Sequence, residues 1–341
     1  MTAQPDEKPL VLFLTDRGEF HQQSALQDAP PQIEVVIRRR PALDELRSLL
    51  PRVQFIVSER SEVVSAELIA AAPALRGIVR LGSLLVGIDE AAARARGIPI
   101  SMQPVVGTIY VAEHCLMMTL AALKHLARSL WQANSVEHGK TALRGDENTF
   151  SFNWLGLTDI GGLYQKAVGI LGMGEIGVEY ARRVRAFAPA AVYYHKRQRY
   201  PVEIENALGI TFAERDALLA QSDVLLSLLP YAPELDLSLD AAAFARLKSG
   251  AVVVHAGSGS IIDERALIAS LRSGQLSGAA LDTYEYEPLP PDHPLVAYAR
   301  DQRSNLLLTP HTAAASLPSG RADDYAEIVR LLNGEALRFR A

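Results

Sequence analysis

The sequence has few of the features that mark secreted or nucleic-acid-binding chains. Its 341 residues include a single cysteine, Cys115, so no disulfide can form within the chain and an oxidising compartment is not implied. The first nine residues, MTAQPDEKP, are polar and acidic, and we therefore expect no secretory signal peptide. The net charge of −5 argues against nucleic acid or an anionic membrane as a partner. We expect a cytoplasmic protein.

Long uninterrupted apolar runs are also missing. The longest apolar stretch contains Glu113 and His114 and is followed by Lys124 and His125, and we take these polar residues to exclude a membrane span. Cys115 lies inside this stretch, which favours a small buried hydrophobic residue over a nucleophile. With no low-complexity tract and no repeat of fixed period, a chain of this length predicts about two globular domains.

The chain alternates strand-like and helix-like segments, which predicts an α/β protein with parallel sheets. In the first hundred residues we expect strands at Leu10–Thr15, Gln54–Val57, Gly77–Arg80 and Ile98–Ser101, and helices at Leu43–Leu50, Ser65–Ala71 and Asp89–Arg96. The basic cluster Arg38–Arg40 is predicted to be a solvated loop. A long helix follows at about Val111–Ala133, and its apolar residues on more than one face predict that it is buried between other elements.

A second series of predicted strands follows a stretch of sequence that shows no clear helix or strand pattern. We expect these strands at Val168–Leu171, Ala191–Tyr194, Val224–Leu228, Ala251–Val254, Gly278–Leu281 and Leu306–Leu308, and a final helix at Arg321–Leu332. Residues 135 to 165 between the two series are rich in glycine and contain Phe150, Phe152 and Trp154. We interpret this stretch as an ordered excursion whose aromatic residues line a substrate entrance, form a subunit contact or simply anchor the loop.

A glycine-rich turn after one predicted strand indicates a dinucleotide site. The strand Val168–Leu171 runs into Gly172-Met173-Gly174-Glu175-Ile176-Gly177, and a helix and another strand complete a βαβ unit of the Rossmann type. In such a turn the first glycine permits the tight bend, the second lets the backbone approach the pyrophosphate, and the third lets the helix pack closely on the strand. The phosphates lie against free N–H groups at the start of the helix.

The end of the next strand predicts which nicotinamide cofactor is preferred. An acidic residue at this point would bind the ribose 2′-hydroxyl and repel a 2′-phosphate. The sequence has no acid here and instead presents His195, Lys196, Arg197 and Arg199. Because charge-assisted hydrogen bonds to a phosphate are strong, we expect NADP(H) to be preferred over NAD(H). A solvated basic turn is the alternative.

Two further segments at strand ends carry residues suited to acid–base chemistry. One runs from Leu281 through Asp282 and Glu287 to Pro288, and the other is Leu308-Thr-Pro-His311. A histidine has a suitable pKa for delivering a proton to a reacting oxygen, and a carboxylate partner fixes its tautomer. In an open parallel sheet, ligands bind beyond the carboxyl ends of the strands, where both segments lie.

With these motifs the chain resembles the D-isomer-specific 2-hydroxyacid dehydrogenases over essentially its whole length. The matching pieces are Val111–His114, Gly172–Gly177, Ser222–Val224, Leu229-Pro230, Ile262–Glu264, Gly278–Pro290 and Thr309–His311. The resemblance implies that His311 is the general acid or base and that Glu287 orients it, with Asp282 behind them. It also implies cofactor contacts from Gly172, Met173, Gly174, Glu175, Ile176, Gly177, His195, Lys196, Arg197, Leu229, Pro230, Ala256, Gly257, Asp282 and His311.

The sequence departs from the family pattern where the family binds the substrate carboxylate. An N-x-x-R-G segment is usual, but here the sequence reads His255-Ala-Gly-Ser258-Gly259, with serine in place of the arginine. The substrate loop after Arg80 keeps Gly82 but follows it with Ser83 and lacks the second glycine. The usual asparagine is replaced within Pro104–Thr108. We expect Ser258, Gly82, Ser83 and Arg80 to contact the substrate, with Arg60 or Arg80 as a possible relocated cation.

These observations predict two Rossmann-like or flavodoxin-like domains with a cleft between them. Residues 1–112 and 312–341 would form the substrate domain, and residues 113–311 the dinucleotide-binding domain. The predicted function is NADP(H)-dependent hydride transfer to or from a hydroxyl or carbonyl compound that lacks the usual carboxylate clamp. The alternatives are an ordinary 2-ketoacid reductase with a relocated cation and a nicotinamide-binding regulator without turnover. We expect a small-molecule substrate, a homodimer, and no metal.

Overall fold

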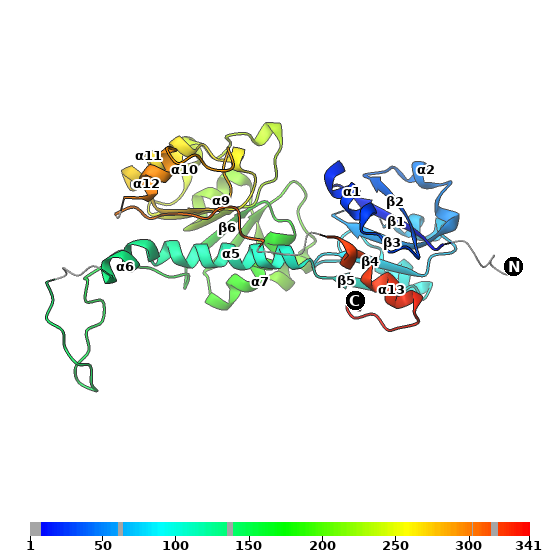
Figure 1. Ribbon diagram of the computed structural model, residues 1–341, viewed down its shortest axis with the longest axis horizontal. Coiled ribbons are helices and arrows are strands. Elements are labelled where there is room, and N and C mark those ends of the chain that lie inside the picture. Colours follow the sequence, from blue (N-terminus) through cyan, green and yellow to red (C-terminus); the bar gives the residue numbers. More distant parts are fainter. Residues whose placement is uncertain (1–7, 61–63, 135–138, 302, 315–319) are drawn as a thin grey trace. The chain divides into compact units, whose positions relative to one another are not determined.

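The computed structural model describes residues 8–60, 64–134, 139–301, 303–314 and 320–341. The chain divides into two compact units, Met1–Val106 with Leu317–Ala341 and Gly107–Ser316 (Figure 1). They are called unit one and unit two below, and each is described by itself. Both contain a parallel β-sheet, so the predicted α/β class is confirmed.

Unit one contains a five-stranded parallel sheet in the order β2-β1-β3-β4-β5. This is the order of flavodoxin-like domains. Its strands are β1 (Leu10–Thr15), β2 (Glu34–Arg39), β3 (Val53–Glu59), β4 (Gly77–Leu81) and β5 (Ile100–Gln103). Its helices are α1 (Glu19–Gln27), α2 (Leu43–Leu46), α3 (Ala66–Ala71), α4 (Glu90–Ala95) and α13 (Ala326–Leu332), with short 3₁₀ turns at Leu50–Arg52 and Ala322–Tyr325. The four strands expected in this region are therefore confirmed.

Strand β2 corrects one prediction. Arg38 and Arg39 were expected in a solvated loop, but they lie in β2, which pairs with β1 over its whole length. The polar sequence did not predict this strand, because β2 is the outermost strand of the sheet and leaves several side chains in solvent. An edge strand of this kind lacks the continuous apolar run of a central parallel strand.

The C-terminal segment completes the core of unit one. Tyr325 and Ile328 are fully buried and pack with Phe13, Phe55 and Val79 of the sheet. The Tyr325 hydroxyl donates a hydrogen bond to the Ala25 carbonyl of α1. Residues more than 200 positions apart in sequence thus share one core, which explains why the last helix belongs to the first unit.

Unit two contains a seven-stranded parallel sheet in the order β12-β11-β10-β9-β6-β7-β8. Its strands are β6 (Ala167–Leu171), β7 (Ala191–His195), β8 (Thr211–Phe212), β9 (Val224–Ser227), β10 (Ala251–His255), β11 (Leu276–Leu281) and β12 (Leu306–Leu308). Its later helices are α7 (Glu175–Val184), α8 (Val202–Leu208), α9 (Arg215–Gln221), α10 (Ala241–Arg246), α11 (Glu264–Ser273) and α12 (Pro294–Ala299), with 3₁₀ turns at Arg185–Phe187, Pro233–Leu235 and Gly259–Ile261. All six strands expected here are confirmed, and only the two-residue β8 was missed.

The long helix predicted at Val111–Ala133 is two helices. These are α5 (Val106–Leu123) and α6 (Leu126–Ala133), separated at His125, whose backbone is left-handed with φ 47°. By length and composition α5 is apolar enough to cross a membrane. The prediction that Glu113 and His114 exclude a membrane span was therefore wrong. In the structure one face of α5 packs in unit two, where the Thr119 hydroxyl bonds to the Tyr180 hydroxyl.

The excursion before β6 contains no helix or strand between residues 139 and 165, and residues 135–138 lie outside the described part. It extends from the end of α6 as a long open loop (Figure 1). Phe150 and Phe152 are 73% and 81% exposed. Trp154 is 39% exposed and has an interaction partner, so the substrate-entrance, subunit-contact and loop-anchoring interpretations all stay open.

Candidate active site

The catalytic pair predicted from the sequence is in contact in unit two. Nδ1 of His311, just beyond β12, lies 2.6 Å from Oε2 of Glu287. The second carboxylate oxygen of Glu287 accepts a hydrogen bond from the Tyr284 backbone N–H at 3.0 Å. Each oxygen of Glu287 therefore has a partner, and the imidazole is held through one nitrogen. His311 has φ 51°, a backbone conformation that is uncommon for residues other than glycine and recurs at functional sites.

Buried Asp282 holds the segment that carries His311. Its carboxylate is 1% exposed and accepts bonds from the Thr309 hydroxyl at 2.6 Å and from the backbone N–H groups of Thr312 and Ala313 at 3.0 and 2.9 Å. These bonds bracket His311 on both sides. Asp282 thus lies beside the segment that carries His311, and both the catalytic role of the His311–Glu287 pair and the contact of Asp282 with the cofactor stay predictions.

Two residues that support the site were not assigned to it from sequence. His114, in the middle of α5, lies with its Nε2 3.0 Å from the Thr309 hydroxyl and 3.5 Å from the Asp282 carboxylate. The Tyr284 hydroxyl donates to the Thr309 carbonyl at 2.8 Å. The position of His114 within the VAEH segment that matches the family was the available signal.

The glycine-rich turn has the shape that a dinucleotide needs. A Cβ on Gly172, where φ is 90°, would lie 2.7 Å from the Leu228 backbone, and one on Gly177 would lie 2.9 Å from the Met173 sulfur. A Cβ on Gly174 would instead meet nothing within 4 Å. Gly174 is the N-cap of α7 and supplies no side-chain cap. The turn therefore presents a helix N-terminus with open space at the second glycine, as a bound pyrophosphate requires.

Some of the cations in the basic turn after β7 already interact with other residues of the chain. Arg199 forms a two-pronged ion pair with buried Glu205, with distances of 2.8 and 2.6 Å. Arg199 was expected among the cations for a 2′-phosphate, but this pairing accounts for its charge. The Lys196 ammonium lies 3.8 Å from the centre of the Tyr200 ring, and Nδ1 of His195 donates to the Ala213 carbonyl.

Arg197 is exposed and makes no hydrogen bond or ion pair with the described residues. The Tyr200 hydroxyl donates to the Met173 carbonyl at 3.0 Å. Tyr200 thus connects the basic turn to the glycine-rich turn, so that both parts of the predicted site are held together.

The segment after β10 packs against the segment after β9. The Ser258 N–H donates to the Leu229 carbonyl at 2.9 Å, and the Ala256 N–H donates to the Ser227 carbonyl. A Cβ on Gly257 would lie 2.6 Å from the Leu229 carbonyl oxygen, so only glycine allows this approach. Ala256, Gly257, Leu229 and the following Pro230 therefore lie at neighbouring strand ends.

His255 occupies the position where the family has asparagine. Its Nε2 lies 3.0 Å from the Ser258 carbonyl oxygen, to which it donates a hydrogen bond. The ring is fully buried, and burial lowers the pKa of His255 to about 4. A neutral imidazole therefore fixes the backbone of the turn that carries Ser258.

The remaining predicted substrate residues lie in unit one, beyond β4. Arg80 is buried, and its guanidinium donates to the Leu84 carbonyl at 3.0 Å and to the Ser58 hydroxyl at 3.2 Å. The Gly82 N–H donates to the Gln103 carbonyl, and Ser83 is buried. Arg80 thus holds the loop that contains both residues. In the described residues, no group of His, Cys, Asp and Glu side chains has the arrangement of a metal site.

Comparisons with known proteins agree with this geometry. Residues 120–313 match the model of the D-isomer specific 2-hydroxyacid dehydrogenase, NAD binding domain. The chain is 31% identical to a glyoxylate reductase of Korarchaeum cryptofilum over 85% of this chain and 79% of the relative. It is 33% identical to a D-3-phosphoglycerate dehydrogenase of Archaeoglobus fulgidus over 83% of this chain but only half of the relative.

A solved structure, a glyoxylate reductase from Paecilomyes thermophila, covers 99% of both chains with 26% identity and a TM-score of 0.52.

Proposed function

Because the chain belongs to the D-isomer specific 2-hydroxyacid dehydrogenase family, we propose that it is an NADP(H)-dependent oxidoreductase. It would transfer hydride between the cofactor and a small hydroxyl or carbonyl compound. The observation that carries this proposal is the contact between His311 and Glu287 at 2.6 Å, held in place by Asp282 and Tyr284. A scaffold without turnover has no need of such a pair.

The residues of unit two fit the cofactor. The open space at Gly174 and the uncapped start of α7 suit the pyrophosphate, and Lys196 and Arg197 suit a 2′-phosphate. Leu229, Pro230, Ala256 and Gly257 would contact the nicotinamide half. The bound cofactor would supply the hydride acceptor or donor. We assign the dinucleotide to unit two and the substrate loop to unit one.

His311 would accept or donate the proton that accompanies hydride transfer. With Nδ1–H donated to Glu287, the neutral imidazole leaves Nε2 as the atom that takes a proton from a hydroxyl group. In the opposite direction the imidazolium donates that proton to the carbonyl oxygen. The Glu287 carboxylate stabilises the imidazolium and fixes the tautomer, and its own orientation is set by the Tyr284 N–H.

Ser258 defines the proposed class of substrate. A serine hydroxyl forms one neutral hydrogen bond, whereas an arginine pairs with a carboxylate through two charged ones. Arg80, one candidate for a relocated cation, already donates hydrogen bonds to the Leu84 carbonyl and the Ser58 hydroxyl. From Ser258 we propose a carbonyl or hydroxyl compound whose reacting carbon does not carry a carboxylate; Arg60, the other candidate for a relocated cation, is exposed and is the alternative that the test below addresses. The glyoxylate reductases among the relatives support an ordinary 2-ketoacid reductase as the second candidate.

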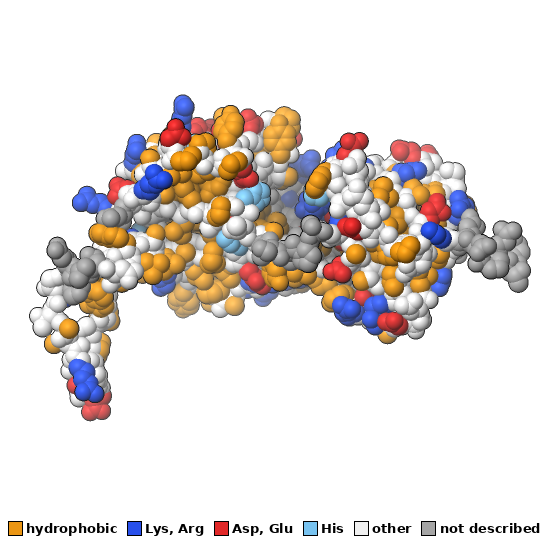
Figure 2. All heavy atoms as spheres, viewed as in Figure 1, with side chains coloured by type: hydrophobic (Ala, Val, Ile, Leu, Met, Phe, Trp, Pro, Cys, Tyr) orange, Lys and Arg blue, Asp and Glu red, His pale blue; other side chains and the backbone are white. Residues whose placement is uncertain are grey.

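A homodimer through unit two is part of the proposal. Helices α5 and α6 expose large hydrophobic side chains, among them Met117, Leu130 and Trp131, and the excursion exposes Phe150 and Phe152. Figure 2 shows hydrophobic side chains gathered along this side of unit two. Soluble monomers rarely expose large contiguous apolar surfaces, so a second copy of the chain is a reasonable partner.

The test measures NADPH oxidation with matched pairs of substrates, each a 2-ketoacid and its ester. We expect turnover, and a kcat/KM for the ester at least about tenfold higher, because an unpaired buried carboxylate costs about 2–5 kcal/mol. No turnover with any carbonyl compound would contradict the proposed activity. A strong preference for the free acids would instead establish the 2-ketoacid reductase.

A further inference from the structure

Helix α5 contacts both ends of β12, the strand that leads to His311. Before β12, the Asn305 side-chain amide donates a hydrogen bond to the Ala122 carbonyl of α5 at 2.9 Å. After β12, the Thr309 hydroxyl lies 3.0 Å from Nε2 of His114, which also belongs to α5. Strand β12 is short and is the outermost strand of the sheet, with β11 as its neighbour. The position of the His311 segment therefore depends on α5 as well as on the sheet.

The hydrogen-bond directions around Thr309 follow from its neighbours. The Thr309 hydroxyl lies 2.6 Å from Oδ1 of Asp282 and 3.4 Å from the Leu281 carbonyl oxygen. Because a carboxylate and a carbonyl only accept hydrogen bonds, the single hydroxyl hydrogen goes to the nearer oxygen, that of Asp282. Nε2 of His114 is then the donor of the third contact, and the imidazole carries a hydrogen on Nε2. His114 thus fixes Thr309 in the orientation that binds Asp282.

Asp282 depends on this contact because all its other bonds come from neutral groups. Its carboxylate is 1% exposed and accepts bonds from Thr309 and from the backbone N–H groups of the two residues after His311. Within the part of the chain that the structure describes, His114 is the only side chain capable of positive charge at ion-pair distance from Asp282, with Nε2 3.5 Å from Oδ1. A change at His114 is therefore transmitted to the His311 segment through Thr309 and Asp282.

The face of α5 around His114 is enclosed by other parts of unit two, which limits its movement. The His114 side chain is 14% exposed. Cys115 is buried beside it, and burial, together with the charge of Asp282, raises the pKa of the Cys115 thiol to about 12. One turn further along α5, the Met118 sulfur lies 3.8 Å from the Thr309 hydroxyl. Enclosed side chains on a helix hold a neighbouring group more precisely than side chains on a loop.

We propose that His114 is a positioning residue for proton transfer by His311. It donates a hydrogen bond to Thr309 and so keeps Thr309 and Asp282 in the arrangement that holds the His311 segment. His114 itself exchanges no proton with the substrate. The inference rests on the proposed function, because it assigns His114 a part in the same reaction.

Two substitutions of His114 separate hydrogen bonding from proton transfer. His114→Leu removes the donor. In His114→Gln the amide nitrogen lies about as far along the side chain as Nε2 and donates to Thr309 without titrating. Thr119→Val is the matched control, because Thr119 also lies on α5 and its hydroxyl lies 3.0 Å from the Tyr180 hydroxyl of α7. The control thus removes a contact of the same helix with a different element.

Steady-state NADPH oxidation, NADPH titration and thermal unfolding are measured on the full chain. We expect His114→Leu to lower kcat by about tenfold and to leave KM and NADPH affinity within about twofold, because a displaced proton-transfer group slows the chemical step. His114→Gln should recover most of the lost kcat. Thr119→Val should lower Tm but keep kcat within about twofold of the wild type.

Several results would overturn the proposal. An unchanged kcat in His114→Leu would mean that the reaction does not need the contact with Thr309. A loss that His114→Gln does not recover would mean that the hydrogen-bond donor is not what matters. An equal loss in Thr119→Val would mean that kcat follows the general stability of α5. Thr309→Val removes the hydroxyl itself, should show the same loss as His114→Leu, and replaces that variant in the test if His114→Leu does not fold.

Hydrogen exchange separates this inference from the proposed function. The backbone amides of Thr312 and Ala313 donate to Asp282, so their exchange rates report how firmly the segment is held. We expect faster exchange in His114→Leu and wild-type exchange in His114→Gln and in the control. Absence of turnover in the wild type would contradict the proposed function, and the exchange rates would still decide whether His114 holds the segment. Unchanged exchange in His114→Leu would overturn that role.

Discussion

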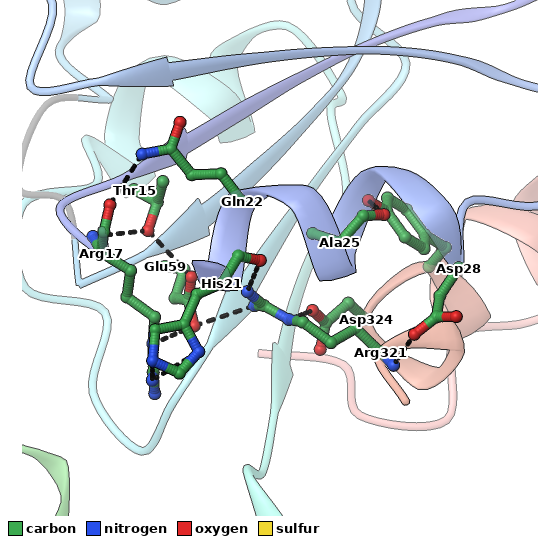
Figure 3. A network of polar contacts seen from close by, with 10 residues as sticks. Thr15, Arg17, His21, Gln22, Ala25, Asp28, Glu59, Arg321 and Asp324 are labelled. Carbon is green, nitrogen blue, oxygen red and sulfur yellow. Dashed lines mark hydrogen bonds and ion pairs between the residues drawn. The ribbon is translucent and has the colours of Figure 1, made fainter. Parts of the chain in front are cut away.

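The two units present different chemistry at the carboxyl ends of similar parallel sheets. In unit two the strand ends carry glycines, and a Cβ at Gly172 or Gly257 would lie within 3 Å of neighbouring backbone. In unit one they carry arginines around buried Glu59 (Figure 3). Backbone N–H groups suit a ligand that lies flat along the chain, whereas guanidinium groups suit a compact charge. The two parallel sheets, which differ in strand order, thus present different chemical groups at their strand ends.

The largest effect is expected from removing the proton-transfer group of unit two. His311→Asn should lower kcat by about 10²–10⁴-fold, because asparagine tolerates the left-handed backbone but cannot transfer a proton. His293→Asn is the matched control, since His293 also lies beside a glutamate, with Nε2 3.2 Å from Oε2 of Glu264, and caps α12, where asparagine is also suitable.

Steady-state NADPH oxidation and NADPH titration check this prediction together. The control should keep kcat within about twofold, and both variants should bind NADPH like the wild type. Full activity in His311→Asn would show that the pair with Glu287 does not carry the reaction.

A smaller effect is expected from adding one methyl group to the glycine-rich turn. Gly174→Ala should fold normally, because its Cβ would meet no atom within 4 Å, but should weaken NADPH binding by at least about tenfold by filling the space for the pyrophosphate. Gly162→Ala also meets no atom and is the control. Thermal unfolding and fluorescence titration measure the two properties. Unchanged NADPH affinity in Gly174→Ala would mean that the cofactor does not approach this turn.

The sequence predicted the buried parts of the fold better than the exposed parts. Central strands such as β6 and β10 are continuous apolar runs, because helices cover both faces of a parallel sheet, and such runs are easily recognised. The edge strand β2 carries Glu34 and two arginines and was taken for a loop. The break between α5 and α6 depends on the backbone of His125, which no periodic pattern reveals.

The candidate site was predictable where motifs are local. His311, Glu287 and the glycine-rich turn lie in short segments whose residue types suffice to identify them. The residues that hold the His311 segment come from separate parts of the chain. Asp282, after β11, and His114, in α5, both contact the hydroxyl of Thr309, which follows β12. The pairing of Arg199 with Glu205 likewise depends on the fold, because the isolated sequence shows only a run of cations.

If unit two is built for NADP(H), as we propose, a titration of the wild-type chain with NADPH and NADH will show the preference. The absence of an acid after β7 and the exposed Arg197 predict that NADPH binds at least about tenfold tighter, a difference of about 1.4 kcal/mol. The preference should shrink as salt is raised, because it depends on charge. Equal affinities, or tighter binding of NADH, would show that the basic turn after β7 does not select the 2′-phosphate.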